Sequence, residues 1–284
     1  MRLLVCSLED NASVNIRDRV LALGNWTKRG ELDGSPVHFL RDMALVTVPR
    51  LHLWNNHIDK VAASALGISI KEVVFLSRHK AASGKRSLTV HPIGNWGRAD
   101  YGGRDATVVP SAPHLMSSLL RQLKKEAAGL DFDITFEVTH HGPYLETPTL
   151  FIEIGSSEAT WGDLDAAQAI ARSLMNVEVS AYPVAMGIGG GHYAPRFTES
   201  SLLKKIDFGH MLPNHAFDLE DREGLADMIR RGMEGSGASL AYIHRKSMKR
   251  SEATLLSELV RSLGYRTVDS SDLEDINPSK PDPN

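Results

Sequence analysis

The sequence predicts an α/β fold with a mixed or mainly parallel central sheet and helices on both of its faces. Short apolar segments alternate with amphipathic ones along nearly the whole chain, which is the rhythm of βα units. The 284 residues are 42% hydrophobic and 24% charged, values typical of globular proteins, so collagen-like, disordered and coiled-coil classes are excluded. A chain of this length folds as one large domain or two modest ones.

The elements follow one another in regular order. Asp10 is the expected N-cap of a helix that ends near Gly24, and Gly67 is the expected end of a helix that begins at Ile58. Further helices are expected at residues 113–128, 158–175, 198–205, 221–233 and 251–263. Strands are expected at residues 3–7, 44–48, 72–76, 88–91, 132–139, 149–154, 181–186, 239–243 and 265–268.

These elements indicate one catalytic α/β domain over residues 1–268. Residues 77–111 are rich in Gly, Ser and Pro and could form a smaller subdomain, since long irregular stretches in compact domains are usually functional or disordered. Residues 269–284 are acidic and contain three prolines, so we expect a flexible C-terminal tail.

Several classes of protein are excluded. The longest apolar runs fall short of the roughly 18 residues of a membrane span, and the apolar start is too short for a secretory signal. We therefore expect a cytoplasmic protein that makes no contact with membranes. Cys6 is the single cysteine, so a metal would have to be held by histidine and carboxylate side chains.

Histidines at strand ends carry the strongest functional signal. His140 and His141 end the strand predicted at residues 132–139, and active sites of open α/β sheets lie at such ends. Adjacent strand residues point to opposite faces, so one of the two is expected to be structural unless the strand breaks after Thr139. His79, His91, His210 and His215 lie in similar contexts, which indicates a shared metal or catalytic site.

A single carboxylate, Glu153, lies among apolar residues of a predicted strand. Charged groups are rarely placed there without a partner, so Glu153 is a candidate metal ligand, general base or histidine orienter. An edge-strand carboxylate that faces water explains the pattern equally well.

Three consecutive glycines, Gly189, Gly190 and Gly191, precede His192. The spacing matches neither a dinucleotide fingerprint nor a P-loop. A bare backbone beside a histidine suits an oxyanion pocket or the close passage of a substrate, and the alternative is a flexible hairpin.

The charge distribution is uneven. The formal net charge of −3 argues against a general nucleic-acid binder, but Lys and Arg concentrate in residues 78–104 and 245–250. Such clusters are either solvated faces or the footprint of a polyanion.

Taken in order, these segments resemble the archaeal and plant-type D-aminoacyl-tRNA deacylases. The resemblance covers residues 7–246 and is carried by the motifs Ser77-Arg78-His79, Val138-Thr139-His140-His141-Gly142-Pro143 and Gly187-Ile188-Gly189-Gly190-Gly191-His192-Tyr193-Ala194-Pro195-Arg196. It implies hydrolysis of the ester between a D-amino acid and the 3′ end of tRNA, zinc dependence, and a fold similar to the phosphorylase and peptidyl-tRNA hydrolase class.

The resemblance leads to hypotheses about which residues bind zinc, catalyse the reaction and contact tRNA. We assign Zn²⁺ to His79, His140, Glu153 and His192. His141 or His210 would be the general base, and the N–H groups of residues 189–191 would hold the oxyanion. The tRNA acceptor end would contact Lys80, Lys85, Arg86, Arg98 and Lys246.

Two alternatives and one further expectation accompany this hypothesis. A zinc-dependent peptidase or amidohydrolase of similar fold would share the histidines but would not need the basic clusters. A non-catalytic tRNA-binding protein would show no turnover. We expect a monomer.

Overall fold

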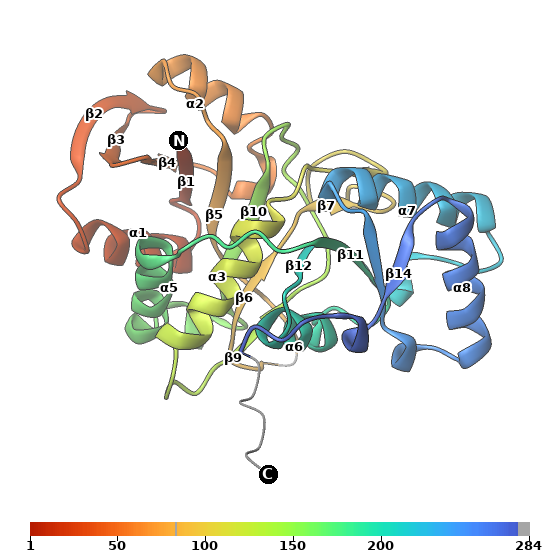
Figure 1. Cartoon of the computed structure of the whole chain (residues 1–284). Helices are drawn as coiled ribbons and strands as arrows, with labels where there is room; N and C mark the ends of the chain where they lie inside the picture. Colours follow the sequence, from red (N-terminus) through yellow and green to blue (C-terminus); the bar gives the residue numbers. More distant parts are fainter. Residues whose placement is uncertain (83, 278–284) are drawn as a thin grey trace, which may run out of the picture.

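The computed structural model describes residues 1–82 and 84–277, and its strands form two main sheets (Figure 1). The larger sheet has the order β2-β3-β4-β1-β5-β10-β6-β9, and the smaller has the order β12-β11-β13-β14. The strands of the larger sheet are β1 (Arg2–Ser7), β2 (Thr27–Leu32), β3 (Ser35–Leu40), β4 (Met43–Val48), β5 (Glu72–Arg78), β6 (Ser87–His91), β9 (Asp133–Phe136) and β10 (Thr149–Gly155). Those of the smaller sheet are β11 (Val184–Ile188), β12 (Asp207–Leu212), β13 (Leu240–Ile243) and β14 (Arg266–Val268).

The predicted mixed, largely parallel α/β architecture is confirmed. In the larger sheet β4, β1, β5 and β10 run parallel, whereas β6 is antiparallel to β10 and parallel to β9. The smaller sheet is parallel throughout. Its separation from the larger sheet was not predicted, because the alternation of strands and helices does not encode which strands pair.

Each face of the larger sheet packs against its own core. On one face Leu4, Leu76 and Ile152 pack with α1 (Asn11–Ala22), α3 (Pro113–Glu126) and α5 (Leu164–Asn176). On the other face Val5 and Phe151 pack with α2 (Ile58–Leu66). The expectation of helices on both faces is therefore met, and no helix of the described residues is long and apolar enough to cross a bilayer.

The smaller sheet lies between α7 (Arg222–Ser236) with α8 (Arg250–Ser262) on one face and α6 (Pro195–Leu203) with α3 on the other. Two backbone hydrogen bonds join it to the chain that leaves β9. The N–H of Thr139 donates to the carbonyl of Met211 over 3.0 Å, and that of Val138 donates to the carbonyl of His192 over 3.0 Å. His192 is thereby brought to the edge of the larger sheet.

Local differences from the predicted elements have identifiable causes. The hairpin β2–β3 was missed because β2 is polar and almost wholly exposed, although Asp33 and Gly34 form its turn with positive φ angles of 51° and 74°. The helix predicted at residues 158–175 is two helices, α4 (Glu158–Trp161) and α5, because Asp163 starts a new helix by accepting the N–H of Ala166 at 2.9 Å.

Residues 77–111 do not form a subdomain of their own. They supply β6 to the larger sheet, next to its edge strand β9, and β7 (Gly94–Asn95) and β8 (Thr107–Val108) form a small ribbon. Short 3-10 helices lie at η1 (His52–Trp54), η2 (Asn214–Ala216), η3 (Arg245–Ser247) and η4 (Ser270–Asp272).

The predicted flexible tail is docked over its first part. Lys204 at the end of α6 pairs with Asp275 at 2.7 Å, and the N–H of Ile276 donates to the carbonyl of Leu203 over 2.9 Å. The rest of that prediction, residues 278–284, lies outside the described residues.

Candidate active site

Polar side chains gather on the α2 face of the larger sheet, at its centre. Glu153 of β10 is in register with Ser77 of β5, and His91 at the end of β6 is in register with Phe151 of β10. Glu137 follows β9 directly. Because successive strand residues point to opposite faces, the apolar residues between these positions remain in the core of the other face.

A cavity of about 430 Å³ opens over these strands. Its wall includes His79, His140, His141 and His192 together with Glu153. It also includes the exposed side chains of Lys80 and Tyr101 at its mouth. Segments that are far apart in sequence therefore meet at one concave site, which is where ligand sites usually form.

Glu137 is the centre of the histidine cluster. Its Oε2 lies 2.9 Å from Nε2 of His192, 3.1 Å from Nδ1 of His79 and 3.5 Å from Nε2 of His140. The carboxylate is fully buried, and neither of its oxygens accepts a well-formed hydrogen bond from any group in the described part of the chain. Buried carboxylates are normally satisfied, so this one needs an explanation.

Backbone carbonyls fix the tautomers of three of the rings. The Nδ1–H groups of His140, His141 and His91 donate to the carbonyls of Val138, Gly142 and Pro92 over 2.7, 2.6 and 3.1 Å. In the neutral rings Nε2 is then a bare acceptor. His140 points this nitrogen at Glu137, and His91 points it at Oε2 of Glu153 over 3.6 Å. Two acceptors that face each other repel unless a proton or a cation lies between them.

The pKa values of the clustered side chains shift in different directions. Burial raises the pKa of the Glu137 carboxyl, but the contacts with His192 and His79 outweigh burial and hold that pKa well below its usual range. Burial and the neighbouring His91 lower the pKa of His141 to about 3. Burial, reinforced by His91 and His141, also brings the pKa of His140 well below its usual value. Although burial acts against it, the hydrogen bond and the charge of Glu137 raise the pKa of His79 overall, so that this ring favours a proton beside the carboxylate. A cation that replaced this proton would bind the carboxylate and the imidazole nitrogens together.

The donor atoms are spaced as a metal site demands. Three groups have all their donor atoms within 4.8 Å of one another: His79, Glu137 and His192; His91, His140 and His141; and His91, Glu137 and Glu153. Around a tetrahedral zinc ion, donors at about 2.0–2.1 Å from the metal are roughly 3.3 Å apart. The measured separations of 2.9–3.7 Å bracket that value, so these residues fit a divalent cation.

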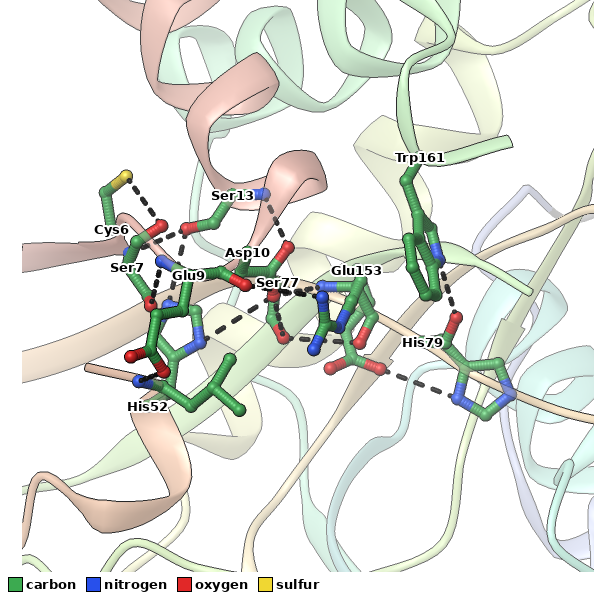
Figure 2. Close-up of polar contacts among 12 residues, drawn as sticks. Cys6, Ser7, Glu9, Asp10, Ser13, His52, Ser77, His79, Glu153 and Trp161 are labelled. Atoms are coloured by element: carbon green, nitrogen blue, oxygen red, sulfur yellow. Dashed lines mark hydrogen bonds and ion pairs between the residues drawn. The ribbon is translucent and has the colours of Figure 1, made fainter. Parts of the chain in front are cut away.

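A buried network supports the cluster from the side of α1 (Figure 2). Asp10 caps α1 by accepting the N–H of Ser13 at 2.9 Å, and it also accepts the N–H of Arg78 at 2.9 Å. The indole N–H of Trp161 donates to the carbonyl of His79 over 3.0 Å (Figure 2). The end of β5, and with it His79, is thus held on both sides.

Comparison with known proteins identifies the family. A family model described as D-aminoacyl-tRNA deacylase matches residues 66–268. Proteins named D-aminoacyl-tRNA deacylase from Methanosarcina mazei and Pyrococcus furiosus are 36% and 35% identical to this chain; the matches cover 96% and 94% of it and 93% and 99% of those proteins. The chain belongs to the D-aminoacyl-tRNA deacylase family.

Two further comparisons bear on this family member. A protein of the same name from Methanococcoides burtonii is 37% identical over 95% of this chain, but the chain spans only 57% of that relative's length. The crystal structure of a conserved protein of unknown function superposes with a TM-score of 0.85 at 30% identity, covering 96% of each chain. The fold described above is therefore shared over nearly the whole chain.

All the metal ligands that we predicted, His79, His140, Glu153 and His192, meet in the cluster of this deacylase-family chain. Glu153 does not face water on an edge strand, since it is 2% exposed and β10 lies between β5 and β6. Sequence reasoning named His91 as a candidate for the shared site without giving it a role, and it did not select Glu137. Both alternate with apolar residues in predicted strands, the same signal that pointed to Glu153.

The structure places the two candidate general bases, His141 and His210, in different surroundings. His141 joins the cluster, and its strongly lowered pKa makes it a better ligand than a proton acceptor. His210 does not join it. The imidazole of His210 is fully buried, with Nδ1 3.1 Å from the hydroxyl of Thr139 and with Nε2–H donating to the carbonyl of Val109 over 2.8 Å. His210 lies within β12, which is buried along its whole length, so both nitrogens of its ring have hydrogen-bonding partners inside the protein.

The glycine run shapes a turn. Gly189 and Gly190 have φ angles of 106° and 92°, which only glycine adopts readily. The N–H of Gly189 donates to the carbonyl of Leu212 over 2.8 Å, and that of Gly190 donates to the side chains of Asn214 and Ser247 over 3.1 and 3.0 Å. These two amides are therefore not available to an oxyanion. Gly191 leads directly into His192.

The predicted tRNA contacts lie in different surroundings. Lys80 is at the mouth of the cavity, and Arg98 and Lys246 are exposed. Arg86 pairs with Asp163 at 2.8 Å and stacks on Phe132, and Lys85 pairs with Asp133. The structure thus brings only Lys80 to the histidine cluster.

Proposed function

We propose that the chain hydrolyses the ester between a D-amino acid and the 3′ end of tRNA, with zinc held by the histidine cluster. One observation carries this proposal: the buried Glu137 carboxylate lies within 3.5 Å of three imidazoles that line the cavity, those of His79, His140 and His192, with donor spacings that suit the metal. Membership of the deacylase family supports the substrate class.

When bound, zinc would polarise the ester carbonyl and acidify a water molecule. His79, His140 and His192 would hold it together with Glu137, and the backbone carbonyl of Val138 would keep the His140 ring in the right tautomer. Oε2 of Glu153 lies 3.7 Å from Nδ1 of His79 and would accept the proton that leaves the attacking water. The walls of the cavity would orient the D-enantiomer.

Tyr193→Phe is expected to weaken zinc binding by about 10- to 100-fold, the usual effect of losing a group that orients a ligand. The Tyr193 hydroxyl lies 3.1 Å from Nε2 of His79, so it holds Nδ1 toward Glu137. Competition between the apoprotein and a fluorescent chelator measures the affinity. Tyr182→Phe, at a half-buried tyrosine whose ring lies under Arg121, is the matched control and should leave the affinity unchanged. Equal affinities of the Tyr193 variant and the wild type would contradict this role.

The proposed function is tested by the release of D-tyrosine and L-tyrosine from their charged tRNAs by purified protein. We expect rapid loss of the D-ester alone, loss of activity after chelation, and recovery when zinc is restored. Turnover of peptides with no turnover of the tRNA ester would instead favour a zinc peptidase or amidohydrolase. Binding of tRNA with no turnover by folded, zinc-loaded protein would favour the non-catalytic alternative.

Location and assembly are part of the same proposal. A tRNA substrate places the working protein in the cytoplasm, which cell fractionation tests. A monomer is proposed for the solution state, and sedimentation of the zinc-loaded protein with and without tRNA tests it.

A further inference from the structure

Tyr101 has an unusual position at the mouth of the cavity. Its side chain is 69% exposed, yet its ring forms part of the wall that also contains His140 and His141. Tyr101 and Trp54 are the large aromatic side chains with exposed positions in residues 1–82 and 84–277, and Trp54 does not line the cavity. An exposed aromatic ring beside a reaction site is a candidate binding surface.

The loop that carries Tyr101 is held tightly in place. Gly102 and Gly103 have φ angles of 76° and 85°, and a Cβ atom at Gly102 would lie only 1.9 Å from the carbonyl oxygen of Leu53. The side chain of Asn95 donates to the carbonyl of Gly102 over 2.9 Å. The loop backbone therefore has little freedom to carry the ring away from the cavity.

The same loop is tied to the histidine cluster. The N–H of Gly142, the residue after His141, donates to the carbonyl of Tyr101 over 3.0 Å. The backbone that positions His141 thus also positions the tyrosine. This direct connection fixes the backbone of Tyr101, from which the ring projects, relative to the metal-binding groups.

The surroundings of the ring carry both cations and carboxylates, with Asp100 and Asp105 on the loop of Tyr101. Lys80 lies on the same cavity wall, and Arg98 and Arg104 are exposed on the same loop. Arg98 has one neighbouring carboxylate, Asp100 at 3.3 Å, and both side chains are largely exposed. Cations of this kind bind phosphates, and aromatic faces bind unpaired bases.

We propose that Tyr101 is the stacking platform for the unpaired base at the 3′ end of the tRNA. This inference rests on the proposed function. The ester is attached to the terminal ribose, so when the ester lies against the histidine cluster its base must lie at the cavity mouth. Single-stranded RNA ends are recognised mainly by stacking on aromatic side chains. Lys80 and Arg98 then neutralise the adjoining phosphates.

The test compares Tyr101→Leu, which keeps an apolar side chain without a ring, with Tyr101→Phe, which keeps the ring. A lost stack of one base weakens binding by about 5- to 100-fold. We expect wild-type protein to bind uncharged tRNA by that factor more tightly than the same tRNA lacking its 3′-terminal adenosine. Tyr101→Phe should keep this preference and Tyr101→Leu should lose it. Trp54→Leu is the control with an exposed aromatic outside the cavity, and it should keep the preference.

Deacylation gives the second readout. Tyr101→Leu should lower kcat/KM by the same factor for D-tyrosyl-tRNA and D-alanyl-tRNA, mainly through KM. A loss confined to D-tyrosyl-tRNA, with the preference for the terminal adenosine intact, would show that the ring contacts the amino acid and would overturn the proposal. Wild-type behaviour of Tyr101→Leu in both readouts would also overturn it. Absence of D-ester hydrolysis by the wild type would instead count against the proposed function, because the binding preference is measured without turnover.

Discussion

Glu137→Gln is expected to weaken zinc binding and to lower kcat/KM for D-tyrosyl-tRNA, each by roughly 10²- to 10³-fold. The substitution keeps the size of the side chain but removes the charge that His79, His140 and His192 approach within 3.5 Å. Removing one partner from a buried charged group generally costs about 3–5 kcal/mol, and each 1.4 kcal/mol is about tenfold in affinity. Zinc analysis after dialysis and initial rates of deacylation measure the two effects.

Glu199→Gln is the matched control for this experiment. Glu199 is an exposed glutamate on α6, outside the histidine cluster, so its variant should retain wild-type zinc content and rate. Full activity of Glu137→Gln with zinc retained would show that the Glu137 carboxylate is not part of the metal-binding machinery.

His210→Ala is expected to lower the free energy of unfolding by about 3 kcal/mol at pH 7.5. The change removes a fully buried ring and leaves the carbonyl of Val109 and the hydroxyl of Thr139 without their partner. Urea unfolding measures the loss. His215→Ala, at an exposed histidine nearby in the sequence, should stay within about 0.5 kcal/mol of the wild type.

His210→Ala also tests how the free energy of unfolding depends on pH. Burial lowers the pKa of His210 to about 4 from its ordinary value of 6.5. Between these values the unfolded chain binds a proton that the folded protein does not, so this contribution to stability is complete above pH 6.5 and is lost as the pH falls toward 4. At pH 5 the wild type should have lost about 2 kcal/mol through His210, and the gap to His210→Ala should shrink to about 1 kcal/mol. A gap that does not change with pH would contradict the lowered pKa.

Much of the site could be predicted from the sequence because its signals are local. His79, His140 and Glu153 each lie in or beside a strand that apolar patterning predicts, and a charged or titratable group in that setting is conspicuous. Glu137 carries the same signal. It was passed over because the two histidines that follow it are more conspicuous.

The other features of the site depend on tertiary contacts that no local sequence pattern encodes. His192 reaches the cluster because the segment before α6 bonds to the chain after β9, which joins the two sheets. His210 and Gly190 looked equally suitable in sequence, but tertiary hydrogen bonds occupy their polar groups. Whether a polar atom is free or already engaged becomes known only when the whole chain is assembled.

The alternation of side chains across β6, β9 and β10 divides each strand into two interleaved sets of positions. Residues 88, 90, 134, 136, 150, 152 and 154 pack in the core of one face, whereas 89, 91, 137, 151 and 153 point to the other face, on which 151 and 153 line the cavity. Evolution can therefore alter one set while the other stays fixed, so that substrate preference and thermal stability can change independently. A shift of pairing by a single residue would exchange the two sets and turn the metal-binding groups toward the apolar core against α3 and α5, so these groups depend on the register of the sheet.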